Sequence, residues 1–153
     1  MLVKGNFKTV IELPKYVDPN EWLSFNSPSV EYTWTDSQSK KNSKLPAPQY
    51  IDYMATSIEN LLNDESIFPT KAGRDFPREL IVVVRRIFSQ LFRLFAHIYH
   101  HHFDKVLSLH EEPHFNSLFA HFISFAREFD LLDKKELLPL QPLIDILIKN
   151  EMI

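Results

Sequence analysis

The chain has 153 residues, with 17 Lys and Arg against 20 Asp and Glu, so its net charge of −3 gives no overall field that would attract nucleic acid or an anionic membrane. It contains no cysteine, which excludes disulfides, iron–sulfur clusters, thiolate zinc sites and a cysteine nucleophile. The two glycines, Gly5 and Gly73, lie too far apart for a Rossmann fingerprint or a P-loop.

The first third of the chain predicts extended and irregular structure. Residues 2–12 and 30–34 are rich in β-branched and aromatic types, which favour short strands. Residues 36–45 are mostly Ser, Lys and Asn, which predicts a solvated loop. We expect one domain over 1–153, made of an N-terminal extended region (1–35), a polar loop (36–47) and a helical core (48–153).

Helical spacing begins at Pro48, a residue that suits a first helical turn. A turn is expected at 68–73, and Asp75 is the predicted N-cap of a long helix that is apolar on more than one face. Such a helix is predicted to be central in a bundle, with its arginines at the water-facing side. The apolar residues that predict these two helices are Ile51, Met54, Ile58, Leu61 and Leu62, then Leu80, Val83, Val84, Ile87, Leu91, Leu94, Phe95 and Ile98.

Two further helices are predicted toward the C-terminus. One starts at Pro113, and the other starts after Pro139 and Pro142, preceded by a capping-box spacing from Asp133 to Glu136. Their apolar stripes are Phe115, Leu118, Phe119, Phe122, Ile123, Ala126 and Phe129, and Leu143, Ile144, Leu147 and Ile148. The most apolar run, residues 80–84, leads into arginine, so no membrane insertion is expected. The predicted fold class is all-α.

Residues 110–114 match the H-E-x-x-H pattern of zinc proteases. That chemistry needs His110 and His114 on one face of a continuous helix, with Glu111 as base. Pro113 is best tolerated in a first helical turn, which would leave His110 outside the helix. The geometry therefore argues against a catalytic site, and a zinc-dependent hydrolase is kept only as an alternative.

A second histidine cluster, His97 and His100 to His102, follows the long helix. His97 and His101 are one turn apart, but two ligands on one helix do not complete a metal site, and no cysteine is available. We expect a structural role for these histidines.

Local charge also favours a protein partner. Residues 45–70 contain no Lys or Arg but include Asp52, Glu59, Asp64 and Glu65, so this face could meet a basic partner. Near the N-terminus, Asp18 and Glu21 flank Trp22, an arrangement that protein interfaces use as an anchor. The alternative for the acidic segment is an ordinary solvated helix surface, and the alternative for Trp22 is a half-buried core tryptophan.

The run from Leu91 to Phe103 resembles the signature of the Mob (Mps-one-binder, or phocein-like) kinase co-activators. Motifs at 48–53, 68–77, 121–125 and 136–140 follow in the family's order. Residues 2–9 and 13–18 are similar to fungal second-type Mob proteins, which are partners of NDR-class kinases in morphogenesis pathways. The resemblance implies a Mob-type helical bundle without catalytic activity.

What the resemblance implies about function is an adaptor that binds the N-terminal regulatory segment of an NDR/LATS-class kinase and promotes its activation. The implied binding residues are Asp18, Glu21, Trp22 and His121. The resemblance implies a location in the cytoplasm, and together with the partner kinase also at the cell cortex and in the nucleus. An inactive helical scaffold is the other alternative.

This chain departs from the family's pattern at two sites. His97 and His102 hold family zinc-ligand positions, but the two cysteine ligands are absent, so we expect no zinc and no other cofactor unless an omitted segment supplies ligands. Arg93 keeps a phosphopeptide-binding position, but Ser89 and Gln90 replace neighbouring cations, which argues against phosphopeptide docking.

A third departure is one of length. Between Trp22 and Tyr32 the family has a core helix and the zinc loop, roughly thirty residues more than nine residues can span. Either the chain is shortened, which predicts an exposed apolar groove and a homodimer formed by exchange of elements, or disordered residues were left out of the numbering. The second explanation predicts a Cα gap near residues 24–29.

Overall fold

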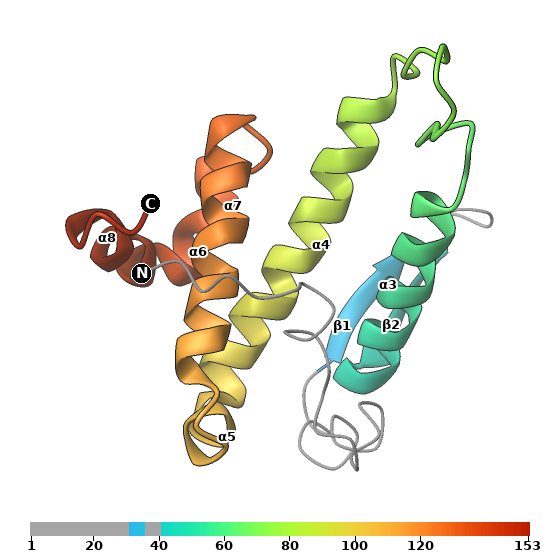
Figure 1. The fold of residues 1–153 in the computed structure, drawn as a ribbon. Coiled ribbons are helices and arrows are strands. Elements are labelled where there is room, and N and C mark those ends of the chain that lie inside the picture. Colours follow the sequence, from blue (N-terminus) through green and yellow to red (C-terminus); the bar gives the residue numbers. More distant parts are fainter. Residues whose placement is uncertain (1–30, 36–40) are drawn as a thin grey trace. The chain divides into compact units, whose positions relative to one another are not determined.

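The computed structural model describes residues 31–35 and 41–153, and the chain divides between Asp75 and Phe76 into two compact units. The first unit contains β1 (Glu31–Thr35), β2 (Asn42–Pro46) and α3 (Ala47–Leu62). The second contains α4 (Leu80–His101), α5 (Phe103–Ser108), α6 (Glu112–Glu128), α7 (Lys134–Leu137), the 3-10 turn η1 (Leu138–Leu140) and α8 (Gln141–Lys149) (Figure 1). The described part is mostly helical, as the sequence predicts.

A two-stranded antiparallel sheet opens the first unit. β1 pairs with β2 in a register that runs from Glu31 opposite Pro46 to Thr35 opposite Asn42. The prediction of a polar loop was therefore wrong for 42–46, although the strand at 31–35 is confirmed. The polar side chains of β2 did not signal a strand because most of them stay exposed, while backbone hydrogen bonds to β1 supply the order.

α3 packs on this hairpin through aromatic rings. Tyr32 and Trp34, which alternate with exposed neighbours along β1, lie with ring centroids 5.1 and 5.8 Å from that of Tyr50. Tyr50 is buried together with Ala47 and Met54, at the i, i+3 and i+7 spacing of one helix face. Of the predicted stripe, Met54 is buried, Ile51, Ile58 and Leu61 are partly buried, and Leu62 is 52% exposed.

The predicted turn at 68–73 is confirmed, and Gly73 adopts a φ of 84°, which few other residues tolerate. Asp75, however, does not cap α4, which begins five residues later at Leu80 with Glu79 as the N-cap. Pro77 explains the delay, because the residue before a proline is disfavoured in helical conformation and the helix cannot run through Phe76.

α4 and α6 run side by side in the second unit (Figure 1). They meet through a row of aromatic rings. Phe88 stacks on Phe122 at 4.8 Å between centroids, and Phe95 lies 5.2 Å from Phe119. Tyr99 closes the row against Phe115 at 4.8 Å, and its hydroxyl donates a hydrogen bond to the Asn116 side chain. These rings form the centre of the unit's core.

α8 completes the same core with Ile144 and Leu147, which are 2% and 4% exposed. The predicted capping box is present before α7: the Asp133 N–H donates to the Glu136 carboxylate at 3.1 Å, and the same carboxylate accepts from the hydroxyl of Ser89 in α4. The prediction that Phe129 and Ile148 belong to the core was wrong, since they are 55% and 42% exposed.

α4 buries side chains on two faces, as predicted for a central helix. Phe92 and Phe95 face α6 and α8, whereas Ile87, Gln90 and His97 are buried outside that cluster. The arginines at 85, 86 and 93 are all exposed. Among the described helices, none is long and apolar enough to cross a membrane.

The predictions for residues 2–12 and for a Cα gap near 24–29 concern residues that the structure does not describe. The single-domain organisation and the absence of one family helix and the zinc loop stay predictions.

Because Phe119 is fully buried between α4 and the rest of the core, we expect Phe119→Ala to lower the free energy of unfolding by about 3–5 kcal/mol. The matched control is Phe125→Ala, which removes a ring from the same helix that is 50% exposed and is expected to cost about 1 kcal/mol or less. Urea unfolding followed by circular dichroism measures both. Equal losses would contradict a core centred on α4 and α6.

Candidate functional site

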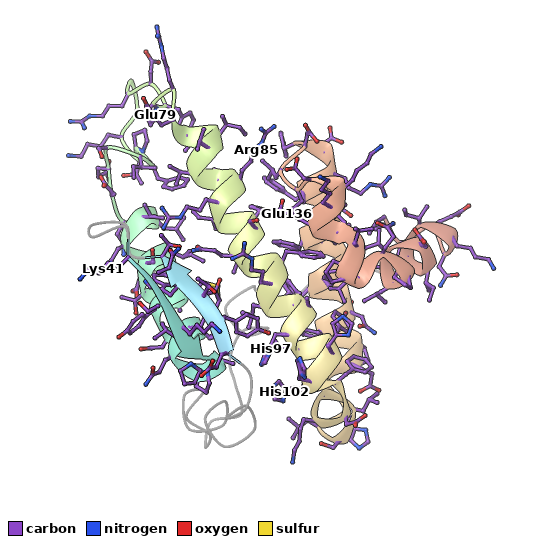
Figure 2. All side chains as sticks on the ribbon, turned by 180° about the vertical axis from the view of Figure 1, so that it is seen from behind. Lys41, Glu79, Arg85, His97, His102 and Glu136 are labelled. Carbon is purple, nitrogen blue, oxygen red and sulfur yellow. The ribbon has the colours of Figure 1, made fainter. Side chains whose placement is uncertain are left out.

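Three histidines gather where α4 ends and α5 begins. The rings of His97 and His102 have centroids 4.8 Å apart, and their Nε2 atoms lie within hydrogen-bonding distance at 3.0 Å (Figure 2). Both side chains are 3% exposed. His101 lies beside them, with its ring centroid 5.1 Å from that of His97, but it is exposed. Sequence spacing paired His97 with His101, whereas the fold pairs it with His102, because α4 breaks at His102 and turns that residue inward.

Burial controls the charge of this pair. Desolvation, followed by the neighbouring His102 and His101, lowers the pKa of His97 to about 4. The pKa of His102 is also lowered, again mainly by desolvation. Both rings are therefore neutral at pH 7, and a hydrogen bond between two Nε2 atoms requires one of them to carry the proton and the other to accept it.

The donor set at this place does not fit the zinc that the resemblance implies. A structural zinc site has four ligands, which are almost always cysteines and histidines. Two imidazoles are present, the sequence has no cysteine, and among residues 31–35 and 41–153 no three His, Cys, Asp or Glu side chains gather closely enough to hold a metal ion. No function is derived through a metal here.

The H-E-x-x-H residues are not arranged on one helix. α6 begins at Glu112 with Pro113 in its first turn, as predicted, and His110 precedes it with a φ of 56°. His110 ends α5 instead: the Glu111 N–H bonds back to the Val106 carbonyl at 3.1 Å, a Schellman-type turn. His110 and His114 consequently lack the i, i+4 geometry that metal binding on a helix requires.

The structure describes the three residues for which the resemblance raised the question of phosphopeptide binding, Arg93, Ser89 and Gln90. Arg93 is exposed on α4, while the Ser89 hydroxyl is engaged by Glu136. Gln90 is buried, and its side-chain oxygen has no hydrogen-bond partner among the described residues. Sequence reasoning noted only that Ser89 and Gln90 are uncharged. The Ser89 contact joins residues 47 positions apart, so no local signal reveals it.

A brace lies at the other end of α4. The Arg85 guanidinium donates to the Asp130 carbonyl at 3.2 Å, and it lies 3.5 Å from the Asp130 carboxylate. Both side chains are more than half exposed, so the ion pair itself contributes little. The hydrogen bond from Arg85 to the Asp130 carbonyl links the turn after α6 to α4.

The expected partner-binding residues lie in different parts of the chain. His121 is exposed on the outer face of α6, one helical turn before the half-exposed Phe125. Asp18, Glu21 and Trp22 lie outside the described residues, so their proximity to His121 stays a prediction.

Fold and site together define a predominantly helical protein with a small β-hairpin and a buried histidine pair at the end of its longest described helix. The sequence profile of the Mob1/phocein family matches residues 25–140. This chain belongs to that family.

Curated relatives agree with this assignment. The CBK1 kinase activator protein MOB2 of Saccharomyces cerevisiae is 46% identical over 173 residues, which take in 94% of this chain and 60% of that protein. The maintenance of ploidy protein mob2 of Schizosaccharomyces pombe is 42% identical, covering 95% of this chain and 71% of its own length. MOB kinase activator-like 1 homolog A of Dictyostelium discoideum is 41% identical, covering 97% and 84%.

The matches also differ from this chain in length. The S. cerevisiae alignment spans 173 positions, yet 94% of 153 residues is about 144, so about 29 positions have no counterpart here. This number is close to the thirty residues that the family's pattern would add between Trp22 and Tyr32. It does not identify the element that those positions form.

We expect stability to fall as the pH drops from 7.5 to 5. The pKa of His97 is about 4 in the folded chain and near 6.5 in the unfolded chain, so the unfolded state binds more protons in this window. Below about pH 6.5 the unfolded chain therefore gains a proton that the folded chain does not bind. The free energy of unfolding should be about 2 kcal/mol lower at pH 5 than at pH 7.5. Urea unfolding at both pH values measures it. His97→Gln should make the free energy of unfolding less dependent on pH, whereas His114→Gln, at an exposed position, should not. An equal pH dependence in both variants would show that His97 is not its cause.

Proposed function

We propose that this chain is a non-catalytic co-activator that binds the N-terminal regulatory segment of an NDR/LATS-class protein kinase and promotes its activation. The observation that carries the proposal is family membership together with a relative, 46% identical, whose name describes it as a kinase activator. The chain spans 60% of that relative's length, so it corresponds to the matched part of such an activator.

Support for a non-catalytic role comes from the geometry of the candidate catalytic groups. The zinc-hydrolase alternative needs His110 and His114 on one helix, but His110 adopts a left-handed conformation before α6 begins. An amidase activity that disappears in His114→Ala would favour the hydrolase. A folded chain that binds no kinase segment would favour the inactive scaffold.

The proposed partner surface combines acidic and aromatic groups. Asp18 and Glu21 would pair with the Lys and Arg of a basic kinase segment, Trp22 would provide an apolar anchor, and His121 would contribute from the outer face of α6. Charge complementarity acts mainly on the association rate, whereas a desolvated aromatic anchor supplies affinity.

Three further proposals follow from the family assignment. The chain acts in the cytoplasm, and at the cell cortex and in the nucleus where the kinase is present. It forms a homodimer by exchange of elements if the roughly thirty positions are truly absent. It does not dock phosphopeptides through Arg93, because the hydroxyl of Ser89 is already bonded to a carboxylate rather than replacing the missing cation.

We expect Glu21→Lys to weaken binding of the kinase segment most at low salt, because screening reduces the charge contribution at higher ionic strength. Trp22→Ala should weaken binding at every salt concentration, by about 2 kcal/mol or more. Calorimetric titration of the segment into folded wild type and variants measures both.

The matched control for Glu21→Lys is Asp52→Lys, the same kind of charge reversal on an exposed position of α3. It should leave affinity nearly unchanged. If it weakens binding while the variants at residues 21 and 22 do not, the interface lies on the acidic face of α3, which also carries Glu59.

Intact mass spectrometry tests the length difference directly. The 153 residues of the sequence have a mass of 18.1 kDa, and we expect that value if the roughly thirty positions between Trp22 and Tyr32 are absent. A chain heavier by about thirty residues would show that the segment exists and would withdraw both the dimer proposal and the expectation of an exposed groove.

A further inference from the structure

We infer that this chain holds no structural zinc at the end of α4, and that a hydrogen bond between His97 and His102 stabilises this position in place of the metal. The inference departs from what family resemblance implies, since the family's pattern places two histidine ligands of a zinc site at these residues. It concerns the fold and is independent of the kinase partner.

The first argument is a count of ligands. All seven histidines of the chain lie between residues 97 and 121, within the described part, and the sequence has no cysteine. His101 is the nearest third imidazole, but its ring centroid is 6.4 Å from that of His102 and its side chain is exposed. Any remaining ligands would have to be carboxylates, which are not the usual ligands of closed structural zinc sites.

The second argument concerns the two Nε2 atoms. They lie 3.0 Å apart, so one carries a proton and donates while the other offers its lone pair. Two zinc ligands in this position would both need an unprotonated Nε2 directed at the ion. The observed contact uses up the lone pair that a metal would need and satisfies both buried nitrogens.

The third argument is energetic. Both histidines are buried, with 3% of each residue exposed, and a buried imidazole nitrogen without a partner is costly. The mutual hydrogen bond removes that cost without any ligand. By contrast, a structural zinc site contributes its binding free energy to folding, so that chelators unfold the protein. The stability of this chain should consequently not depend on zinc.

The experiment measures zinc content and thermal stability on the full chain purified without chelator. We expect well below one zinc per chain by mass spectrometric metal analysis, and the same melting temperature with and without EDTA. One zinc per chain, lost in His97→Asn but retained in His114→Asn, with a lower melting temperature in EDTA, would overturn the inference. Zinc that is lost in His114→Asn instead comes from surface histidines and leaves the inference standing.

A second measurement does not depend on a variant that folds. Long-range nitrogen–proton NMR spectra at pH 7.5 distinguish a protonated from an unprotonated imidazole nitrogen. We expect one of the two rings to carry its proton on Nε2 and the other to have an unprotonated Nε2. If Nε2 is unprotonated in both rings and the spectrum changes on adding EDTA, both nitrogens bind a metal and the inference fails. Either failure would leave the proposed kinase binding unaffected.

Discussion

The aromatic contact between α4 and α6 is the interaction on which the second unit depends. Phe88, Phe95 and Tyr99 on α4 meet the rings of α6 at successive turns, so the two helices are fixed along most of their length. Aromatic pairs contribute beyond the area they bury, and their preferred geometries restrict sliding and rotation. α8 then has a defined apolar surface to cover, and the histidine pair and the Arg85 brace occupy opposite ends of a helix whose position is already set.

Helices commonly end at a glycine in the left-handed conformation, but this chain has only two glycines, so other residues take that conformation at its helix ends. His110, Asp130 and Glu151 all adopt left-handed φ values of 50–56°, and each follows a helix whose last carbonyls are bonded by the next N–H groups. For residues with a Cβ this conformation costs roughly 1–2 kcal/mol. The turns are nevertheless retained because they bring buried or braced residues into place, as Leu131 shows: its N–H bonds to the Ala126 carbonyl at 2.8 Å and its side chain is 3% exposed.

The sequence predicted those features whose cause is local. Helical periodicity, Pro113 in a first turn and the Asp133–Glu136 capping box all act within a few residues, and all three are confirmed. The polar strand β2 and the inward turn of His102 depend on partners far along the chain or on a helix break, and sequence spacing missed both. The helix ends at His110 and Asp130 were missed because the usual signal, a glycine, is not there. The expected partner residues near Trp22 rest on local charge, an aromatic side chain and the family resemblance, and they lie outside the described residues.

The two buried faces of α4 differ in chemistry, and this difference decides what each face needs to be stable. The face toward α6 is aromatic and is satisfied by packing alone, so substitutions there cost stability directly. The other face buries Gln90 and His97, polar groups that need specific partners. His97 is bonded to His102, whereas the Gln90 oxygen has no partner within the part of the chain that the structure describes. An unpartnered buried oxygen typically costs about 1–3 kcal/mol, while the Phe92 and Phe95 side of the same helix carries no such penalty. The aromatic face therefore fixes the position of α4 by packing, whereas the stability of the other face depends on whether each buried polar group has a specific partner.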